Sequence, residues 1–184
     1  MTLADLSARF WGPYSRLGLA VAAATLVIDQ ADKWWMLLAY DIRAKGRVAA
    51  TPFLDLVFVL NQGVSYSFLT GSGLRWQYAL AAFAGLASLA LTVWLARGIT
   101  NTLAAVSVGL IIGGALGNGL DRLTLGGVAD FFSLHAFGYY WYVFNIADVA
   151  IVAGVLGLLY ESFVLQARAV APDATATKST QSPS

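Results

Sequence analysis

One stretch of this chain is long and apolar enough to cross a lipid bilayer. Residues 78–96 (YALAAFAGLASLALTVWLA) contain no charged side chain, and about 20 apolar residues in a helix span the hydrocarbon core. Such a segment is helical in lipid, because a helix satisfies its own backbone hydrogen bonds. Of all 184 residues, 59% are hydrophobic and 11% are charged. The sequence therefore predicts an integral membrane protein with a single domain.

Four segments of this kind predict a mainly α membrane protein with four transmembrane helices. The expected spans are about 16–38, 76–96, 102–120 and 142–165. The apolar part of the first span is too short to cross alone. Asp29 and Lys33 therefore lie at its far end, where their i,i+4 spacing favours a structural ion pair. In the third span Gly109, Gly113 and Gly117 recur every four residues, which predicts close packing against another helix.

The segments between the spans predict structure at the membrane surface. Residues 41–73 contain two runs rich in β-branched and aromatic residues, 52–60 and 64–69, around the turn signal at 61–63, and so predict a small extracytoplasmic β-sheet. Between Arg122 and Asn145 eight aromatic residues predict a segment lying along the membrane interface. Residues 1–166 then form one domain, and the polar residues 167–184 are expected to be a disordered tail.

The composition excludes several classes of function. A net charge of +1 argues against a nucleic-acid partner, which requires a basic patch. The chain has no cysteine, which excludes disulfides and thiol catalysis. Its single histidine, His135, is interpreted as an interfacial side chain. Neither a metal site nor a cofactor is expected.

Polar residues at the ends of the predicted spans converge on one membrane surface. The chain has ten acidic residues, and three of them, Asp121, Asp130 and Asp148, lie between apolar segments. A charge near the bilayer centre costs at least ~2.5–3.5 kcal/mol, so such acids are usually functional. Lysines and arginines divide evenly between the two sides, so they do not set the orientation. The convergent residues are Asp29, Lys33, Asn61, Asn118, Asp121, Arg122, Asp130, Asn145 and Asp148.

Two close carboxylates can hydrolyse an amide, because their repulsion leaves one shared proton for acid–base exchange. Asn61, Asn118, Asn145 and Arg122 can hold a peptide main chain in an extended form, and Arg122 can equally pair with Asp121 to orient Asn118. Two alternatives from other classes remain open. A serine–lysine peptidase would use Lys33 with Ser65 or Ser67, although Asp29 and Asp32 oppose the deprotonated lysine that it needs. A small proton-coupled transporter would also place acids in membrane helices, but the chain has no internal repeat.

Five motifs, in this order between four apolar spans, resemble the lipoprotein signal peptidase (signal peptidase II) family. They are DQADK (29–33), NQGVSYSF (61–68), GNGLDR (117–122), VADF (128–131) and FNIAD (144–148), and the resemblance covers nearly all of residues 15–165. It implies an intramembrane aspartic peptidase that removes the signal peptide from a diacylglyceryl-modified prolipoprotein, cutting just before the lipidated cysteine. It places the catalytic dyad at Asp130 and Asp148. The other implied substrate-binding or supporting positions are Asp29, Lys33, Asn61, Gly63, Asn118, Asp121, Arg122 and Asn145.

The resemblance also implies a location and partners. The chain is expected in the bacterial cytoplasmic membrane, with both termini cytoplasmic and the active site near the outer face. Lipid-modified prolipoproteins are the expected substrates, membrane lipids the expected surroundings, and a monomer the expected state. Three positions depart from the family pattern, namely Asp32, Gly119 and Val149. None of them is a dyad acid, although Val149 removes a possible hydroxyl partner beside Asp148.

Overall fold

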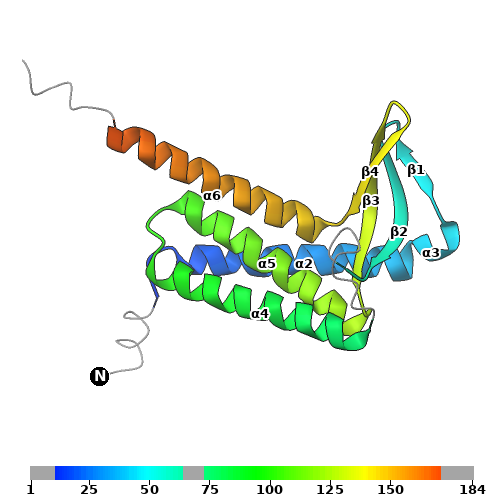
Figure 1. Ribbon diagram of the computed structural model, residues 1–184, viewed down its shortest axis with the longest axis horizontal. Helices are drawn as coiled ribbons and strands as arrows, with labels where there is room; N and C mark the ends of the chain where they lie inside the picture. The colour runs from blue at the N-terminus through cyan, green and yellow to red at the C-terminus, as the bar shows by residue number, and fades with distance from the viewer. Residues whose placement is uncertain (1–10, 64–72, 171–184) are drawn as a thin grey trace, which may run out of the picture.

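Four long helices lie side by side, and a four-stranded sheet stands across one end of them (Figure 1). The computed structural model describes residues 11–63 and 73–170. The long helices are α2 (Ser15–Trp34), α4 (Leu74–Arg97), α5 (Thr102–Thr124) and α6 (Ile146–Val170). Helix α5 packs against each of the other three, so it forms the centre of the bundle.

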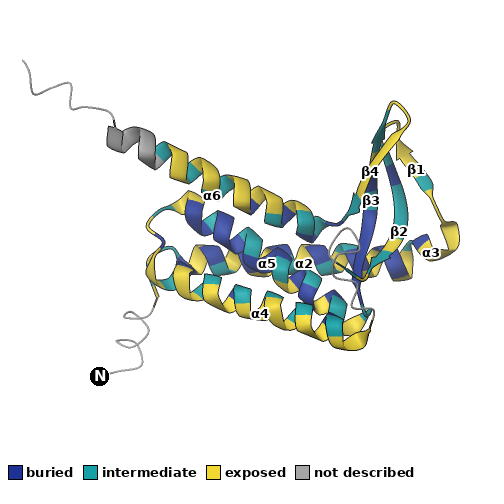
Figure 2. Cartoon of the chain, in the orientation of Figure 1, coloured by how far each residue is buried: buried dark blue, intermediate teal, exposed yellow. Residues whose placement is uncertain are grey.

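Three of the described helices, α4, α5 and α6, are long and apolar enough to cross a membrane. Helix α2 carries Asp29, Asp32 and Lys33 in its last two turns and is less apolar. The mainly helical membrane fold is therefore confirmed, whereas a count of four spans is not. Figure 2 shows that the outer face of α4 is largely exposed, and this face presents large apolar side chains such as Phe83, as expected for contact with lipid.

Small residues let the backbones of the helices approach closely. A Cβ atom at Gly109 would collide with the carbonyl oxygen of Gly18 in α2, and one at Gly113 would collide with that of Ala22. Gly114 lies in the same way against the carbonyl of Ala147 in α6. The glycine spacing therefore predicted the α2–α5 contact correctly, and α5 uses a further glycine to meet α6.

The sheet is antiparallel in the order β1-β2-β3-β4. Its strands are β1 (Val48–Thr51), β2 (Leu54–Asn61), β3 (Val128–Ala136) and β4 (Tyr139–Phe144). The prediction of a sheet confined to residues 41–73 was wrong, because half of its strands come from the aromatic segment. Aromatic residues favour both strands and membrane interfaces, and the sequence pattern did not separate the two. The predicted strand at 64–69 lies outside the described residues.

Several boundaries differ from the predictions. The first helix continues after Trp34 as a π-helix, Trp35–Ala39, and a short helix α3 (Ile42–Lys45) occupies part of the predicted sheet region. Helix α5 extends beyond residue 120 to Thr124. Helix α6 begins at Ile146 and not at 142, because β4 includes the preceding residues. It continues to Val170, so 167–170 are helical, and the rest of the predicted tail lies outside the described residues.

An apolar core between the sheet and the short helices that follow α2 anchors the sheet to the bundle. Met36, Leu37 and Ile42 form this core with Ala129 and Phe131 of β3. Phe131 is fully buried and its ring lies 5.9 Å from that of Phe58 in β2. The sheet is thus fixed on the bundle, and the strand that carries Asp130 is held at the end of the helices.

Candidate active site

Asp130 and Asp148 meet at the junction of β3 and α6, linked by Asn145. Asp130 lies on β3 and is 2% exposed, and Asp148 lies in the first turn of α6. Asn145 donates from Nδ2 to Oδ1 of Asp130 at 2.6 Å and from its backbone N–H to Oδ2 of Asp148 at 3.2 Å. One buried residue therefore bonds to both carboxylates, through its side chain to Asp130 and through its backbone N–H to Asp148.

Asn145 and Asp148 also cap α6 reciprocally. The Asp148 N–H donates to Oδ1 of Asn145 at 2.9 Å, while the Asp148 carboxylate accepts the Asn145 N–H. This exchange satisfies two of the donors that a helix N-terminus leaves free. The helix dipole also favours a carboxylate in the first turn. The same contacts that start α6 thus position Asp148.

Two further asparagines complete the hydrogen bonds of the dyad. Asn118 on α5 donates to Oδ1 of Asp148 at 2.8 Å, and its own Oδ1 accepts from Asn145 at 3.2 Å. Asn61 at the end of β2 donates to Oδ2 of Asp130 at 3.2 Å and accepts the N–H of Gly63 at 3.2 Å. Every carboxylate oxygen of the dyad therefore accepts a hydrogen bond from an asparagine.

Burial raises the pKa of Asp130 to about 6, and the negative charge of Asp148 adds to the increase. The hydrogen bonds from Asn145 and Asn61 oppose this shift, because they stabilise the ionised form. A carboxyl group with a pKa near 6 can hold a proton close to neutral pH and still release it. This is the property that acid–base catalysis requires of one member of a pair.

Lys33 lies buried below the dyad and uses all three of its ammonium protons. It forms ion pairs with Asp29 at 2.9 Å and with Asp121 at 2.8 Å, and it donates to Asn118 at 3.2 Å. The predicted Asp29–Lys33 pair is present. The sequence left open a pair between Asp121 and Arg122. In the structure, Asp121 instead pairs with Lys33.

The two carboxylates bound by Lys33 hold the backbone next to each dyad residue. Asp121 accepts the N–H of Ala129, which precedes Asp130, at 3.1 Å. Asp29 accepts the N–H of Ala147, which precedes Asp148, at 2.9 Å. We refer to Lys33, Asp29 and Asp121 as the lysine clamp. It ties α2, α5, β3 and α6 together at one point.

Sequence reasoning missed Gln30 as a member of this network. Its Nε2 donates to Asp121 at 2.9 Å, to Asp29 at 3.2 Å and to the Gly117 carbonyl at 3.3 Å. The residue stands inside the DQADK motif, beside Asp29, and that position was the available signal. Among the described residues, all ten predicted site positions gather at this end of the bundle.

Arg122 is half-buried at the edge of the site. Its Nη1 donates to the carbonyl oxygen of Asn118 at 3.0 Å, and its buried Nε has no partner among the described residues. Gly119 meets only an ordinary contact with Ala84, so no close approach requires a glycine there. Ser65 and Ser67, the alternative nucleophiles, lie outside the described residues.

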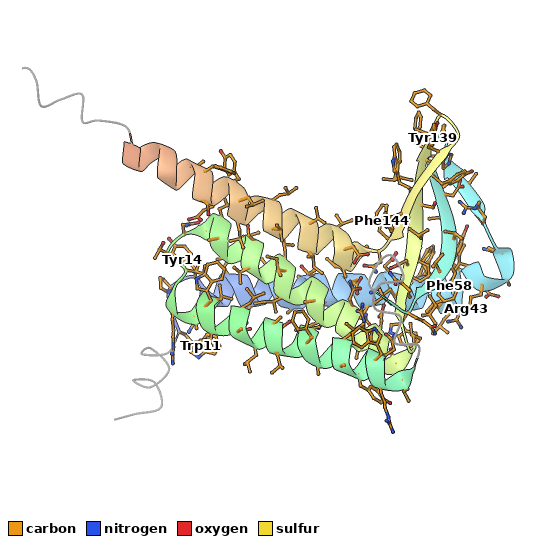
Figure 3. The ribbon with its side chains drawn as sticks, in the orientation of Figure 1. Trp11, Tyr14, Arg43, Phe58, Tyr139 and Phe144 are labelled. Carbon is orange, nitrogen blue, oxygen red and sulfur yellow. The ribbon has the colours of Figure 1, made fainter. Side chains whose placement is uncertain are left out.

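An open apolar groove of about 320 Å³ lies along α6, and Asp148 and Phe144 are among its lining residues. Figure 3 shows Phe144 where β4 leads into α6. The other lining residues are Val149, Val152, Ala153 and Leu156. Val149 is 54% exposed in the groove, so the third departure from the family pattern adds apolar wall beside Asp148.

The model of the family described as Signal peptidase (SPase) II matches residues 21–164. The chain belongs to this family. The lipoprotein signal peptidase of Rhodopseudomonas palustris is 48% identical over 161 residues, covering 85% of this chain and 98% of the relative. That of Nitrobacter hamburgensis is 49% identical over 162 residues, with the same coverages.

Solved structures agree with the fold. One bacterial membrane enzyme gives a TM-score of 0.68 at 26% identity and covers 79% of this chain and 92% of its own. Another bacterial membrane enzyme gives a TM-score of 0.67 at 24% identity and covers 91% of this chain and 94% of its own. At this identity the likeness supports the fold alone. Signal peptidase II enzymes are proteases that remove signal peptides from prolipoproteins, and this chain is such an enzyme of the bacterial inner membrane.

Proposed function

We propose that Asp130 and Asp148 are the catalytic dyad of this signal peptidase II and that it cuts just before a lipidated cysteine. One observation carries the proposal. Asn145 bonds to both carboxyl groups, and one of them, that of Asp130, is buried and has a pKa near 6. The pair then holds one proton. We treat it as a unit, without assigning acid and base to individual residues.

The proposed reaction is a direct attack of water on the scissile carbonyl. The ionised carboxylate takes a proton from water as its oxygen bonds to the carbonyl carbon, and the protonated carboxyl gives its proton to the carbonyl oxygen. Collapse of the tetrahedral intermediate then breaks the C–N bond. One hydroxyl of the intermediate returns its proton to the ionised carboxylate as the new carbonyl forms, and the other carboxyl of the dyad gives its proton to the leaving nitrogen. One water is consumed, and the dyad returns to its one-proton state.

The supporting residues divide into two roles in this proposal. The three residues of the lysine clamp are buried, and Lys33 uses all of its ammonium protons in bonds within the protein. We therefore assign the clamp to positioning and not to substrate binding. Arg122 lies at the edge of the site, and its buried Nε has no hydrogen-bond partner among the described residues. It is the residue that we expect to bind a substrate carbonyl and help to keep the peptide extended. All of these residues come from one chain, which is consistent with a monomer.

The apolar groove along α6 suits the lipid chains of the substrate. Asp148 is the only acidic residue among its described lining residues, and the others are apolar. A diacylglyceryl group in this groove would bring the cysteine backbone to the dyad, and it would bury hydrocarbon at roughly 25 cal/mol per Å². Lipid would thus contribute both affinity and the choice of the bond that is cut.

We infer that α2 is a fourth membrane span and that the sheet lies outside the cytoplasm. Helix α2 has 20 residues and is therefore about 30 Å long, which is the thickness of the hydrocarbon core. Asp29 and Lys33 of α2 are buried at the sheet end but pair with each other within the lysine clamp, which lowers the cost of their burial. Both termini then face the cytoplasm and the dyad lies near the outer surface.

The serine–lysine alternative is not favoured. Lys33 already bonds to Asp29, Asp121 and Asn118, so its amino group is not available to activate a serine hydroxyl. A transporter is not favoured either, since the chain belongs to a peptidase family.

A comparison of two precursor peptides tests the proposed specificity. The peptides share one sequence, and only one carries diacylglyceryl on its cysteine. The purified protein should cut the lipidated peptide on the N-terminal side of the cysteine and cut the other at least about tenfold more slowly, as mass spectrometry of the products would show. Equal cleavage of both peptides, or a cut at another bond, would contradict the proposal.

A further inference from the structure

Gln77 is a buried polar residue outside the dyad network and the lysine clamp. It lies in the first turn of α4 and is 3% exposed. Its Nε2 donates to the carbonyl oxygen of Gln62 at 2.5 Å. This bond joins α4 to the chain just after β2, and no other part of the site described above involves α4.

The carbonyl that Gln77 holds belongs to the residue after Asn61. Asn61 and Val128 form the last register pair between β2 and β3, so the ladder does not hold the backbone beyond this point. Yet the Asn61 side chain bonds to Oδ2 of Asp130 and to the N–H of Gly63. The geometry of this contact therefore depends on a fixed backbone where the sheet has ended.

We propose that Gln77 is a positioning residue of the dyad, because it fixes the Gln62 carbonyl and thereby holds Asn61 against Asp130. The inference rests on the proposed function of Asp130. Gln77 acts through two residues and does not touch the reacting atoms. It gives the α4 N-terminus a part in the site that the sequence motifs do not indicate.

The position of Gln77 allows a variant that removes the bond without leaving a buried group unpaired. The Gln77 Oε1 is buried without a partner among the described residues, so Gln77→Leu also removes this unsatisfied atom. Gln62 is exposed, and its carbonyl can turn to water. Leucine is also a good helix former. Gln77→Glu is a second variant, because a carboxylate fills the same space but cannot donate.

Loss of the bond should change the proton affinity of the dyad as well as the rate. The Asn61 hydrogen bond lowers the pKa of Asp130 against the effect of burial. When Asn61 is released, that pKa rises, and the proton is lost at higher pH. The limb of the pH–rate profile where activity falls with increasing pH should therefore move to higher pH, a change that a merely structural role would not produce.

The test measures kcat, KM and the pH–rate profile of cleavage for these variants in detergent. Gln77→Leu and Gln77→Glu should lower kcat about tenfold, the typical effect of one lost hydrogen bond, with KM nearly unchanged. The high-pH limb should move upward by about half a pH unit or more. Ser88→Ala is the matched control, since Ser88 is a buried polar residue of the same helix and should leave the profile as in the parent protein.

Asn61→Ala completes the test. This variant should show the same shift of the high-pH limb of the pH–rate profile. Adding Gln77→Leu to it should increase the shift only slightly, because both changes break one chain of contacts. The inference is overturned if the Gln77 variants behave like Ser88→Ala, or if the effects of Asn61→Ala and Gln77→Leu simply add. Failure of the dyad proposal looks different, because cleavage would then survive Asp130→Asn.

Discussion

At the scale of single residues, the burial of Asp130 is unfavourable for folding and useful for catalysis. Its pKa near 6 lies about two units above the ordinary value of 3.8, which corresponds to roughly 3 kcal/mol. The folded state binds the proton more tightly than the unfolded state does. The contribution of Asp130 to stability is therefore greatest at low pH and decreases as pH rises from about 4 through 6.

This argument predicts the pH dependence of stability. The midpoint of thermal unfolding in detergent should fall as pH increases from 5 to 7.5 and then level off. Asp130→Asn cannot ionise, so its midpoint should change much less over the same range. Parallel curves for the two proteins would show that Asp130 does not have a raised pKa.

The sequence predicted which residues gather at the candidate site but not how they pair. The motifs supplied the ten candidate positions, and the i,i+4 spacing correctly paired Asp29 with Lys33. The bond between Lys33 and Asp121 depends on the packing of α2 against α5, which no local pattern specifies. The bonds of Gln30 depend on the same packing, so its place in the DQADK motif did not reveal them. The burial of Gln77 had no signal in the sequence.

At the scale of elements, α5 can hold the site together because glycine lies where its neighbours come closest. A Cβ atom at Gly117 would collide with the carboxylate of Asp29, a member of the lysine clamp. The helix thus combines backbone packing with room for buried charges. The sequence predicted the packing but not that Gly117 makes space for a carboxylate.

Gly117→Ala should therefore destabilise the protein by about 1–3 kcal/mol, the usual cost of overpacking, and reduce cleavage. Gly85→Ala is the matched control, because a Cβ atom there meets nothing within 4 Å. It should leave activity intact and stability equal or slightly higher, since alanine is the better helix former. Thermal unfolding and initial cleavage rates measure both effects. Equal behaviour of the two variants would contradict the contact with Asp29.

The elements themselves were predicted unequally. Long apolar segments identified the helices to within a few residues, because their hydrophobicity is independent of distant partners. Strands β3 and β4 were missed. Strand β3 pairs with β2, about 70 positions earlier for Asn61 and Asp130, and β4 pairs with β3. Residues such as Tyr139 and Trp141 were assigned to the interface because their pattern alone does not show this pairing.

At the scale of the whole molecule, the sheet lies at one end of the bundle, and the start of α2 and the end of α6 lie at the other (Figure 1). The lack of native cysteines makes this arrangement testable by single-cysteine labelling. In intact cells, an impermeant thiol reagent should label Ala50→Cys in β1. It should label Thr100→Cys, between α4 and α5, only after lysis. Labelling of Thr100→Cys from outside would reverse the proposed orientation.

In the proposed function, the fold brings two carboxylates from different elements to one bond of a lipidated peptide. Cleavage of a lipid-modified precursor by dyad variants tests this claim most directly. Asp130→Asn, Asp148→Asn and the double variant should each unfold cooperatively and bind the precursor. Each should cleave it at least about a thousandfold more slowly than the parent protein, with the double variant no slower than the singles, because the two residues act as a unit. Cleavage within about tenfold of the parent rate by either folded single variant would contradict the account.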